Sequence, residues 1–386
     1  MPPGLEIIAV PEPHRSGDFI ELAWEINGRN PDWVPPLRIV LARQFNRAKH
    51  PFFNHGDAAF FIAKRDGVTV GRIAAIENRL HVKKYDDGAG FFGLFECKED
   101  DEAARALLGS AARWLKERGF ETMRGPLNYS LNDENPGVLV DGFDGPPVVM
   151  MAHNPEWYGP MLERTGLSKC KDLYAFYVNR DVMDGERFAR VTRAVERRNP
   201  DVKLREIRMD RRGFMEDIET LMAIFNAAWA DNWGMLDVTP AETEVIAKDL
   251  KPVARKEFTA IAEIDGKPVG MIVCVPDINR ILVKNRRGRL LPFGWWPLVT
   301  GLKKLSGMRT MLMGVVPEYR NRGIDAMLIG QIMRVGVEHG QYYCELSWVL
   351  EDNTAMVSLS DKVGAKPYRT YRIYEGNVEE LAKHQV

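Results

Sequence analysis

The sequence contains only four cysteines, and they lie far apart at Cys97, Cys170, Cys274 and Cys344. No two of them form the C-x-x-C pair that would indicate a zinc site or a redox couple. We therefore expect reduced thiols in the core and no bound metal.

The chain also has almost no net charge, because its 53 Lys and Arg nearly balance its 54 Asp and Glu. Such a balance gives no broad positive field, so we expect no nucleic-acid partner. A long apolar run is missing too: the nearest approach, residues 290–302, is broken by two prolines and two glycines. The first thirty residues carry prolines and acids instead of the apolar core of a signal peptide, which predicts a cytoplasmic protein.

What the chain does have is length and apolar content. With 386 residues, 45% of them apolar, it can bury two cores of ordinary size. The segment 180–205 is crowded with Arg, Asp and Glu and is expected to be a solvated helix and linker. We place the two domains at residues 1–190 and 205–386.

An internal repeat supports this division. The stretch 66–73, which begins Asp66-Gly67, is matched by 265–272, which begins Asp265-Gly266, and each follows an alternating apolar run. Because Asp and Gly tolerate the positive φ of a tight turn, each copy is predicted to be a β-hairpin.

Each hairpin is followed by an amphipathic helix with apolar residues at helical spacing, over 104–115 in the first half and 324–335 in the second. After each helix we expect a strand, an Asn (Asn154 or Asn353), a short helix and a final strand. Those final strands are placed at 172–178 and 368–374.

The motif that indicates a chemical function lies in the second copy, between the apolar strand at residues 311–316 and the helix that follows it. The turn there reads Arg320-Asn321-Arg322-Gly323-Ile324-Asp325-Ala326. Backbone N–H groups at a helix N-terminus lack intrahelical partners and face the positive end of the dipole, so such a turn binds anions. Two arginines beside it favour a diphosphate.

A strand, an R-x-x-G-x-G/A turn, an amphipathic helix and a strand leading to an Asn resemble the GNAT superfamily, whose members bind acyl-CoA through this turn. Arg320 and Gly323 match the pattern, whereas Asp325 stands where Gly or Ala is usual. The resemblance implies a mixed α/β fold of two tandem GNAT-like domains, each a twisted mixed sheet flanked by helices. It also implies an acyl-CoA site at Val315, Val316, Arg320, Asn321, Arg322, Gly323, Ile324, Asp325 and Ala326, where the strand's backbone N–H near Val315 and Val316 would polarise the thioester carbonyl.

The first copy lacks this motif. Its helix opens with four carboxylates, Glu99-Asp100-Asp101-Glu102, which would repel a diphosphate and also serve as ordinary helix N-terminal residues. We therefore expect a degenerate first domain that binds no CoA. A polar run there, Asn128 to Asn135, is either a set of solvated turns or the wall of a site.

Amide formation needs a base that takes a proton from an alkylammonium. Glu345 and Ser347 share one face of the predicted strand 342–349, although a carboxylate at a strand edge is also commonly a surface group. Many relatives use a Tyr seven residues after the Asn to protonate the leaving thiolate, and Ser360 stands there. Either another tyrosine replaces it (Tyr368, Tyr371 or Tyr374) or the thiolate leaves unaided. Our catalytic candidates are Glu345, Ser347, Asn353 and Tyr371.

A basic and aromatic insertion, Arg280 to Lys304, separates the second hairpin from the motif strand. It holds seven cations and no acid, interleaved with large apolar residues that include Trp295 and Trp296. This composition fits peripheral contact with the inner face of a membrane. The alternative is a helical insertion packed over the acyl site.

The whole layout resembles a family of two-domain bacterial GNAT proteins that includes ceramide synthases, which acylate a long-chain sphingoid amine. The resemblance implies an N-acyltransferase of lipid metabolism that uses acyl-CoA and an amine. Two alternatives stay open: an acetyltransferase for a small soluble amine, and a non-catalytic acyl-CoA-binding protein.

Overall fold

A computed structural model describes residues 4–181 and 185–384. Its contacts group the chain into two compact units that interleave along the sequence. The first unit comprises Met1–Leu173, Asn279–Val299 and Arg369–Val386, and the second comprises Tyr174–Ile278 and Thr300–Tyr368. The two domains predicted at 1–190 and 205–386 are continuous segments and stay a prediction, whereas the compact units exchange segments.

The first unit is a mixed sheet with helices packed on it. Its strands follow the order β1-β2-β3-β4-β5-β13, and β6 also pairs with β13. The strands are β1 (Leu5–Ala9), β2 (Gly56–Arg65), β3 (Val68–Asn78), β4 (Ala89–Cys97), β5 (Thr122–Gly125), β6 (Val138–Asp141) and part of β13 (Lys366–Asn377). The helices include α1 (Gly17–Asn27), α2 (Arg38–Gln44), α3 (Arg79–Tyr85), α4 (Asp101–Lys116), α5 (Tyr158–Arg164), α9 (Asn279–Leu282) and α13 (Val378–Leu381).

The core of the first unit lies under α4. Alanines and leucines along one face of this helix are fully buried against β3 and β4, as the predicted amphipathic pattern requires.

The second unit repeats the design. Its strands follow the order β7-β12-β11-β10-β9-β8. They are part of β7 (Ser168–Asn179), β8 (Val202–Arg205), β9 (Thr259–Ile264), β10 (Lys267–Pro276), β11 (Gly307–Val315) and β12 (Tyr343–Leu350). The helices are α6 (Gly185–Arg198), α7 (Arg211–Trp229), α8 (Pro240–Leu250), α11 (Ile324–Glu338) and α12 (Thr354–Lys362), while α10 (Trp296–Gly301) spans the boundary between the units.

The two predicted hairpins are confirmed. β2 pairs with β3 and β9 with β10, both antiparallel, and the turn residues Asp66, Gly67, Asp265 and Gly266 all have φ between 50° and 77°. In each copy the next strand, β4 or β11, is antiparallel to the hairpin and is followed by the amphipathic helix, α4 or α11. The strand after that helix is parallel, β5 to β4 and β12 to β11. The repeat read from sequence is thus a repeat of topology.

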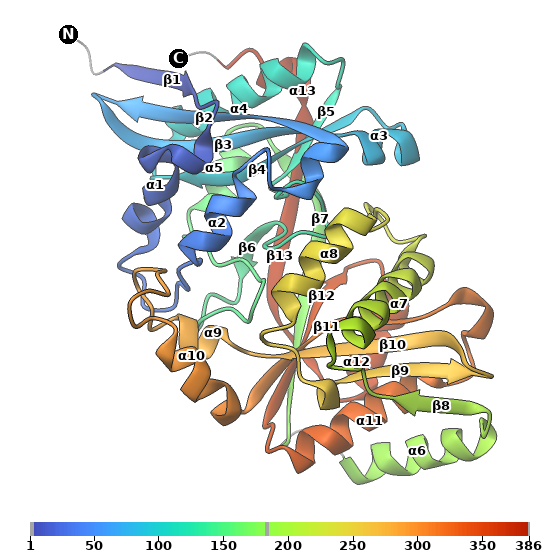
Figure 1. Cartoon of the computed structure of the whole chain (residues 1–386). Coiled ribbons are helices and arrows are strands. Elements are labelled where there is room, and N and C mark those ends of the chain that lie inside the picture. The colour runs from blue at the N-terminus through green and yellow to red at the C-terminus, as the bar shows by residue number, and fades with distance from the viewer. Residues whose placement is uncertain (1–3, 182–184, 385–386) are drawn as a thin grey trace. The chain divides into compact units, whose positions relative to one another are not determined.

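Helices cover both faces of the second sheet. α7 packs on β10 and β11, while α11 packs on β9 and β10 with α6 against its outer side (Figure 1). The charged segment 180–205 is therefore more than a linker. Thr192 of α6 is buried and donates to the carbonyl of Ala326 in α11, and the buried Asn199, just after α6, donates to the carbonyl of Arg322 just before α11.

No described helix is both long enough and apolar enough to span a bilayer.

Candidate functional site

The site begins where two parallel strands of the second unit part. β11 and β12 pair over four residue pairs, from Gly307 with Tyr343 to Thr310 with Leu346, although both strands continue further. At the same point β11 bulges: Val273 of β10 faces Leu312, but the next residue, Cys274, faces Thr310. The extra residue bends β11 away from β12, so its last residues lose their partners on that side.

The bend leaves backbone N–H groups facing the gap. The N–H of Val316 bonds to the carbonyl of Val269 on β10, at 2.9 Å. Alternate N–H groups of an antiparallel strand point in opposite directions, so the N–H of Val315 points toward the side that β12 has left. Of the two predicted donors, Val315 is thus the one placed to meet a ligand in the gap.

The predicted phosphate turn follows β11 directly. Asn321 and Gly323 both take the left-handed conformation, with φ of 63° and 81°, and α11 begins at Ile324. The first N–H groups of α11, which include those of Asp325 and Ala326, have no intrahelical acceptor, which is the arrangement that helix termini use to bind anions.

Both arginines of the turn have partners within the protein. Arg320 donates to the carbonyl of Ala228 at the end of α7, at 2.6 Å, and to that of Val315. Arg322 bonds both carboxylate oxygens of Asp201 at 2.9 Å, and this hydrogen bond lowers the pKa of Asp201. The two cations lie beside the turn, as expected, but they also hold it to the rest of the unit.

The segment around α6 closes one side of the turn. The Asn199 amide donates to the carbonyl of Arg322 at 3.0 Å. A Cβ on Gly323 would lie 2.7 Å from Cγ1 of Val195, so this glycine is needed for packing against α6 as well as for its φ.

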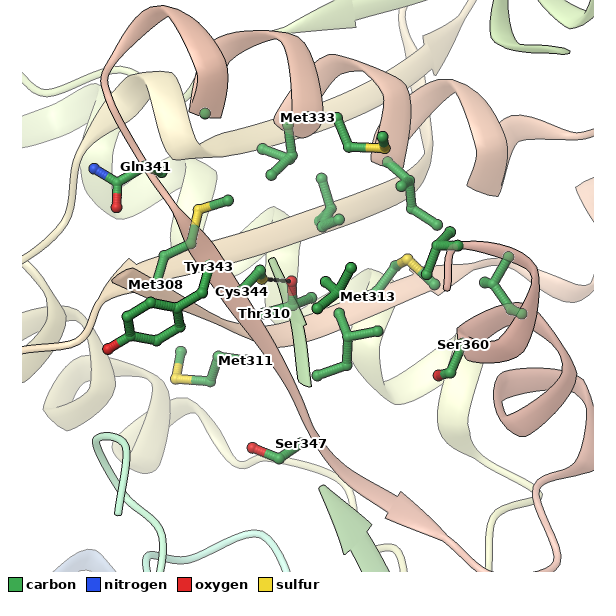
Figure 2. Close-up of a pocket in the computed structure, with 18 of the residues that line it drawn as sticks. Met308, Thr310, Met311, Met313, Met333, Gln341, Tyr343, Cys344, Ser347 and Ser360 are labelled. Atoms are coloured by element: carbon green, nitrogen blue, oxygen red, sulfur yellow. Dashed lines mark hydrogen bonds between the residues drawn. The ribbon is translucent and has the colours of Figure 1, made fainter. Parts of the chain in front are cut away.

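An apolar pocket of about 110 Å³ opens in the second unit beside the parted strands (Figure 2). Side chains from β11, β12, α11 and α12 line much of it, and methionine recurs among them: Met308, Met311, Met313, Met333 and Met356. Thr310 and Cys344 meet in its wall, with Oγ1 and Sγ 3.3 Å apart. Of the expected core thiols, Cys97 and Cys274 are buried, whereas Cys170 and Cys344 are only partly covered. Methionine adapts to irregular apolar guests, so this wall suits a flexible hydrocarbon.

A buried hydrogen-bonded chain adjoins the pocket. Ser347 lines the pocket, and its hydroxyl donates to the carboxylate of Glu345, which is fully buried. Arg309 donates from Nε to the Ser347 hydroxyl and from a terminal nitrogen to the Ser347 carbonyl, both at 3.0 Å. The hydroxyl of Tyr368 donates to the other oxygen of Glu345. The surface-group interpretation of Glu345 is therefore wrong.

Aromatic rings extend this chain. Tyr177 lies between two other tyrosines, with ring centroids 5.4 Å from Tyr343 and 5.7 Å from Tyr368. Tyr343 donates to the buried Asp277 at 2.6 Å. Two buried carboxylates, each accepting from a tyrosine, thus lie at this end of the second unit.

The other candidate residues have different surroundings. Asn353 caps α12 and accepts from the N–H of Met356 at 3.1 Å. Ser360, which stands where relatives have a Tyr, lines the pocket and donates to the carbonyl of Met356. Tyr371 belongs to the first unit, where it is buried on β13 and pairs with Leu139, whereas Tyr368 belongs to the second unit and contacts Glu345.

The first unit closes the corresponding gap with its own chain. β4 and β5 pair only from Ala89 to Phe91, and β4 also bulges. The Asn128 side chain then accepts from the N–H of Leu94 at 2.8 Å, and Leu127 donates to the carbonyl of Phe92. Asn128, the first residue of the polar run, therefore occupies this gap together with Leu127.

The acidic start of α4 is neutralised within the protein. Arg65 bonds Asp100 and Glu102, Arg164 bonds Asp101, and Asp100 caps the helix. The simpler explanation as helix N-terminal groups thus holds for Asp100, Asp101 and Glu102, whereas Glu99 precedes the N-cap residue.

Sequence reasoning missed Arg309. It is a lone cation in the strand 307–315, and such a residue must find a buried polar partner on a neighbouring strand. The sequence shows this lone cation, but it does not show that the pairing of β11 with β12 places Arg309 opposite Glu345. Within residues 4–181 and 185–384, no group of three or more His, Cys, Asp or Glu is placed to hold a metal ion.

Comparison with known proteins agrees with this geometry. Residues 218–365 match the model of the acetyltransferase (GNAT) family. The chain is 36% identical over 379 residues to a bacterial ceramide synthase from Caulobacter vibrioides, covering 96% of this chain and 97% of that protein. It is 35% identical over 368 residues to the protein YghO from Escherichia coli, covering 93% and 92%.

A solved structure shows the same fold over the whole length. A tandem GNAT protein from the clavulanic acid biosynthesis pathway aligns with a TM-score of 0.56 at 12% identity, covering 97% of this chain and 99% of that one. A GCN5-related N-acetyltransferase from Sphaerobacter thermophilus aligns with a TM-score of 0.51 at 12% identity, covering 97% and 96%.

Proposed function

The chain belongs to the GNAT family and is an N-acyltransferase, and we propose that it transfers a long acyl group from acyl-CoA to the amine of a sphingoid base, forming a ceramide. The observation that carries this proposal is the methionine-lined apolar pocket beside the parted strands β11 and β12. The resemblance to a ceramide synthase over nearly the whole chain supports the choice of amine.

Acyl-CoA would bind with its diphosphate on the turn from Arg320 to Ala326 and its pantetheine arm in the gap. The left-handed turn and the start of α11 present N–H groups to the diphosphate. The Val315 N–H would then stabilise the oxyanion that forms when the amine attacks the thioester carbon. The apolar pocket would accept the acyl chain.

Glu345 would be the base, acting through Ser347 at the pocket wall. As the amine loses its proton to the Ser347 hydroxyl, that hydroxyl passes its own proton to Glu345. Arg309 would hold Ser347 in place for this transfer. The C–N bond forms and the C–S bond breaks. Tyr368 would give its hydroxyl proton to the CoA thiolate and take in exchange the proton held by Glu345, to which it is hydrogen-bonded, so that both groups return to their starting states. It would stand in for the usual tyrosine, whose position Ser360 occupies.

A lipid amine also places the reaction at a membrane. We propose that the enzyme acts from the cytoplasm at the inner face of a membrane, with contact through the insertion Arg280–Lys304.

Thiol release from acetyl-CoA and palmitoyl-CoA, each with a sphingoid base and with a polyamine, tests the proposal. We expect palmitoyl-CoA with the sphingoid base to give the highest kcat/KM of the four pairs. Fastest release from acetyl-CoA with the polyamine would identify an acetyltransferase for a soluble amine. Binding of either thioester without release in any pair would identify a binding protein.

A further inference from the structure

The first unit carries an exposed apolar segment at residues 290–299, within the insertion; it consists of a loop and the first residues of α10 and is called the apolar loop below. Five of its large apolar side chains are 40% to 78% exposed: Leu291, Phe293, Trp295, Trp296 and Val299. Large apolar side chains gathered on one short segment of a surface mark a contact with an apolar partner.

The base of this apolar loop is fixed to the first unit. Arg286 donates to three backbone carbonyls, those of Gly28, Asn30 and Trp33, at 2.7 to 2.9 Å. In return, the indole N–H of Trp24 donates to the Arg286 carbonyl at 3.0 Å. The one guanidinium thus joins the insertion to the segment that follows α1.

A second set of bonds holds the next residues. Arg38 at the start of α2 donates from its side chain to the Arg287 carbonyl and from its backbone N–H to the Gly288 carbonyl, both at 2.9 Å. A Cβ on Gly288 would lie 2.3 Å from the Pro36 carbonyl oxygen, so the two segments are in close contact. The apolar loop is therefore exposed on a fixed support, and its exposure is not that of a loose segment.

The exposed cations of this segment flank the apolar loop. Lys284, Arg287 and Arg289 are all exposed just before it, and no Asp or Glu occurs between residues 280 and 304. Within the loop, the rings of Trp295 and Trp296 meet edge to face, with centroids 5.5 Å apart. Tryptophan next to Lys or Arg is typical of protein segments that lie in the interface of a membrane.

We propose that residues 290–299 form a membrane-insertion loop, with Phe293 and Trp296 entering the interface of an anionic bilayer and Lys284 and Arg287 meeting its headgroup phosphates. A second copy of this chain is a poorer occupant, because a two-fold contact sets the same patch against itself and would oppose like charges. The inference deepens the proposed function, since a lipid acceptor must be taken from a membrane. It narrows the proposed membrane contact of Arg280–Lys304 to residues 290–299 and the cations before them. Vesicle binding tests this contact, whereas amide formation from acyl-CoA and a sphingoid base tests the reaction, so failure of one is distinguishable from failure of the other.

Co-sedimentation with vesicles, in the absence of acyl-CoA and amine, tests the loop. The full chain should sediment with vesicles containing phosphatidylglycerol and about tenfold less with vesicles of phosphatidylcholine alone, and added salt should release it. The double variant Phe293→Ser/Trp296→Ser should lower the partition coefficient about tenfold or more. The double variant Lys284→Gln/Arg287→Gln should lower it for anionic vesicles only.

Val68→Ser is the matched control, because Val68 is 56% exposed on the turn of β2 and β3, away from this segment in sequence. It should bind vesicles like the wild type, and all variants should keep the wild-type urea midpoint. Two outcomes would overturn the proposal: a wild-type chain that does not sediment with anionic vesicles at low salt, or a Phe293→Ser/Trp296→Ser variant that binds as tightly as the control. Concentration-dependent dimerisation that this variant abolishes, without vesicle binding by the wild type, would assign the loop to a second copy.

Discussion

Glu345 shows how much a single carboxylate depends on its neighbours. It is fully buried, yet two hydroxyl groups donate to it, and Arg309 reaches it through Ser347. A buried carboxyl group without such donors would be costly, so the hydrogen-bonded chain lowers the cost of burying Glu345 next to an apolar pocket. This arrangement suits a base that must accept a proton and then return it.

Glu345→Gln should therefore remove the base while keeping its shape. We expect kcat for amide formation to fall by about 10² to 10⁴-fold with little change in the affinity for acyl-CoA. Steady-state thiol release and calorimetry of palmitoyl-CoA binding measure the two effects. Glu338→Gln, an exposed change on α11, is the control, and activity of Glu345→Gln within threefold of that control would remove Glu345 from the mechanism.

Asp217 is another buried carboxylate, and its role is stability. Burial alone would raise its pKa, but hydrogen bonds from Arg208 and Arg205 outweigh this and lower the pKa from 3.8 to about 2. A lowered pKa means stability that is present above about pH 4 and is lost as the pH falls toward 2. The difference between these two pKa values of Asp217 corresponds to a contribution of at most about 2 kcal/mol to the free energy of unfolding.

Asp217→Asn should lower the free energy of unfolding at pH 7 by about 2 to 4 kcal/mol, because two arginines lose their buried partner. Its stability should also depend less on pH between 4 and 2 than that of the wild type. Urea unfolding at several pH values measures both, with Glu219→Gln, exposed on the same helix, as the control. Equal slopes with pH in both variants would contradict the assignment.

At the scale of elements, the pocket depends on α11 packing beside two strands that part. Gly336 of this helix lines the pocket, and a Cβ there would first meet the flexible end of Met308 at 3.3 Å. A larger side chain at this position would therefore fill the pocket without a clash against backbone.

Gly336→Leu should lower kcat/KM for palmitoyl-CoA at least about tenfold more than for acetyl-CoA, because only the long chain needs the filled space. Glu338→Leu places the same leucine side chain on α11 at an exposed position outside the pocket and should leave the ratio unchanged. An equal loss on both thioesters would mean that the pocket does not hold the acyl chain.

Sequence patterns were sufficient for the local elements. The Asp-Gly turns, the apolar periodicity of α4 and α11, and the turn from Arg320 to Ala326 are all set by residues close in sequence, and each appears where it was predicted. Packing of α6 on α11 was not foreseen, because it depends on contacts such as Val195 with Gly323, more than 120 residues apart. The charges along residues 180–205 predict an exposed helix, but they do not show that this helix packs on α11.

In the whole molecule, the interleaved units also depend on contacts between residues far apart in sequence, which a local pattern does not predict. Residues 279–299 follow the second hairpin in sequence, but Arg286 bonds backbone carbonyls more than 250 residues earlier. Composition showed that the insertion was basic and aromatic, and its support on the first unit follows from hydrogen bonds to main-chain atoms, which carry no sequence signal.

The two repeats also differ in what fills the gap beside their bulged strands. Asn128 and Leu127 occupy the gap of the first unit, and the acids at the start of α4 are paired with arginines, whereas the second unit has an open pocket. We therefore expect one acyl-CoA per chain. Calorimetric titration with palmitoyl-CoA below its micelle concentration measures this number, and a stoichiometry of two would show that the first unit also binds.

The most direct test of the proposed function is the product itself. The purified chain should be incubated with palmitoyl-CoA and a sphingoid base, and the lipid extract analysed by mass spectrometry. We expect an N-palmitoyl amide that accumulates in step with released CoA and is absent with Glu345→Gln. Release of CoA without that amide, or no reaction at all while palmitoyl-CoA binds, would contradict it.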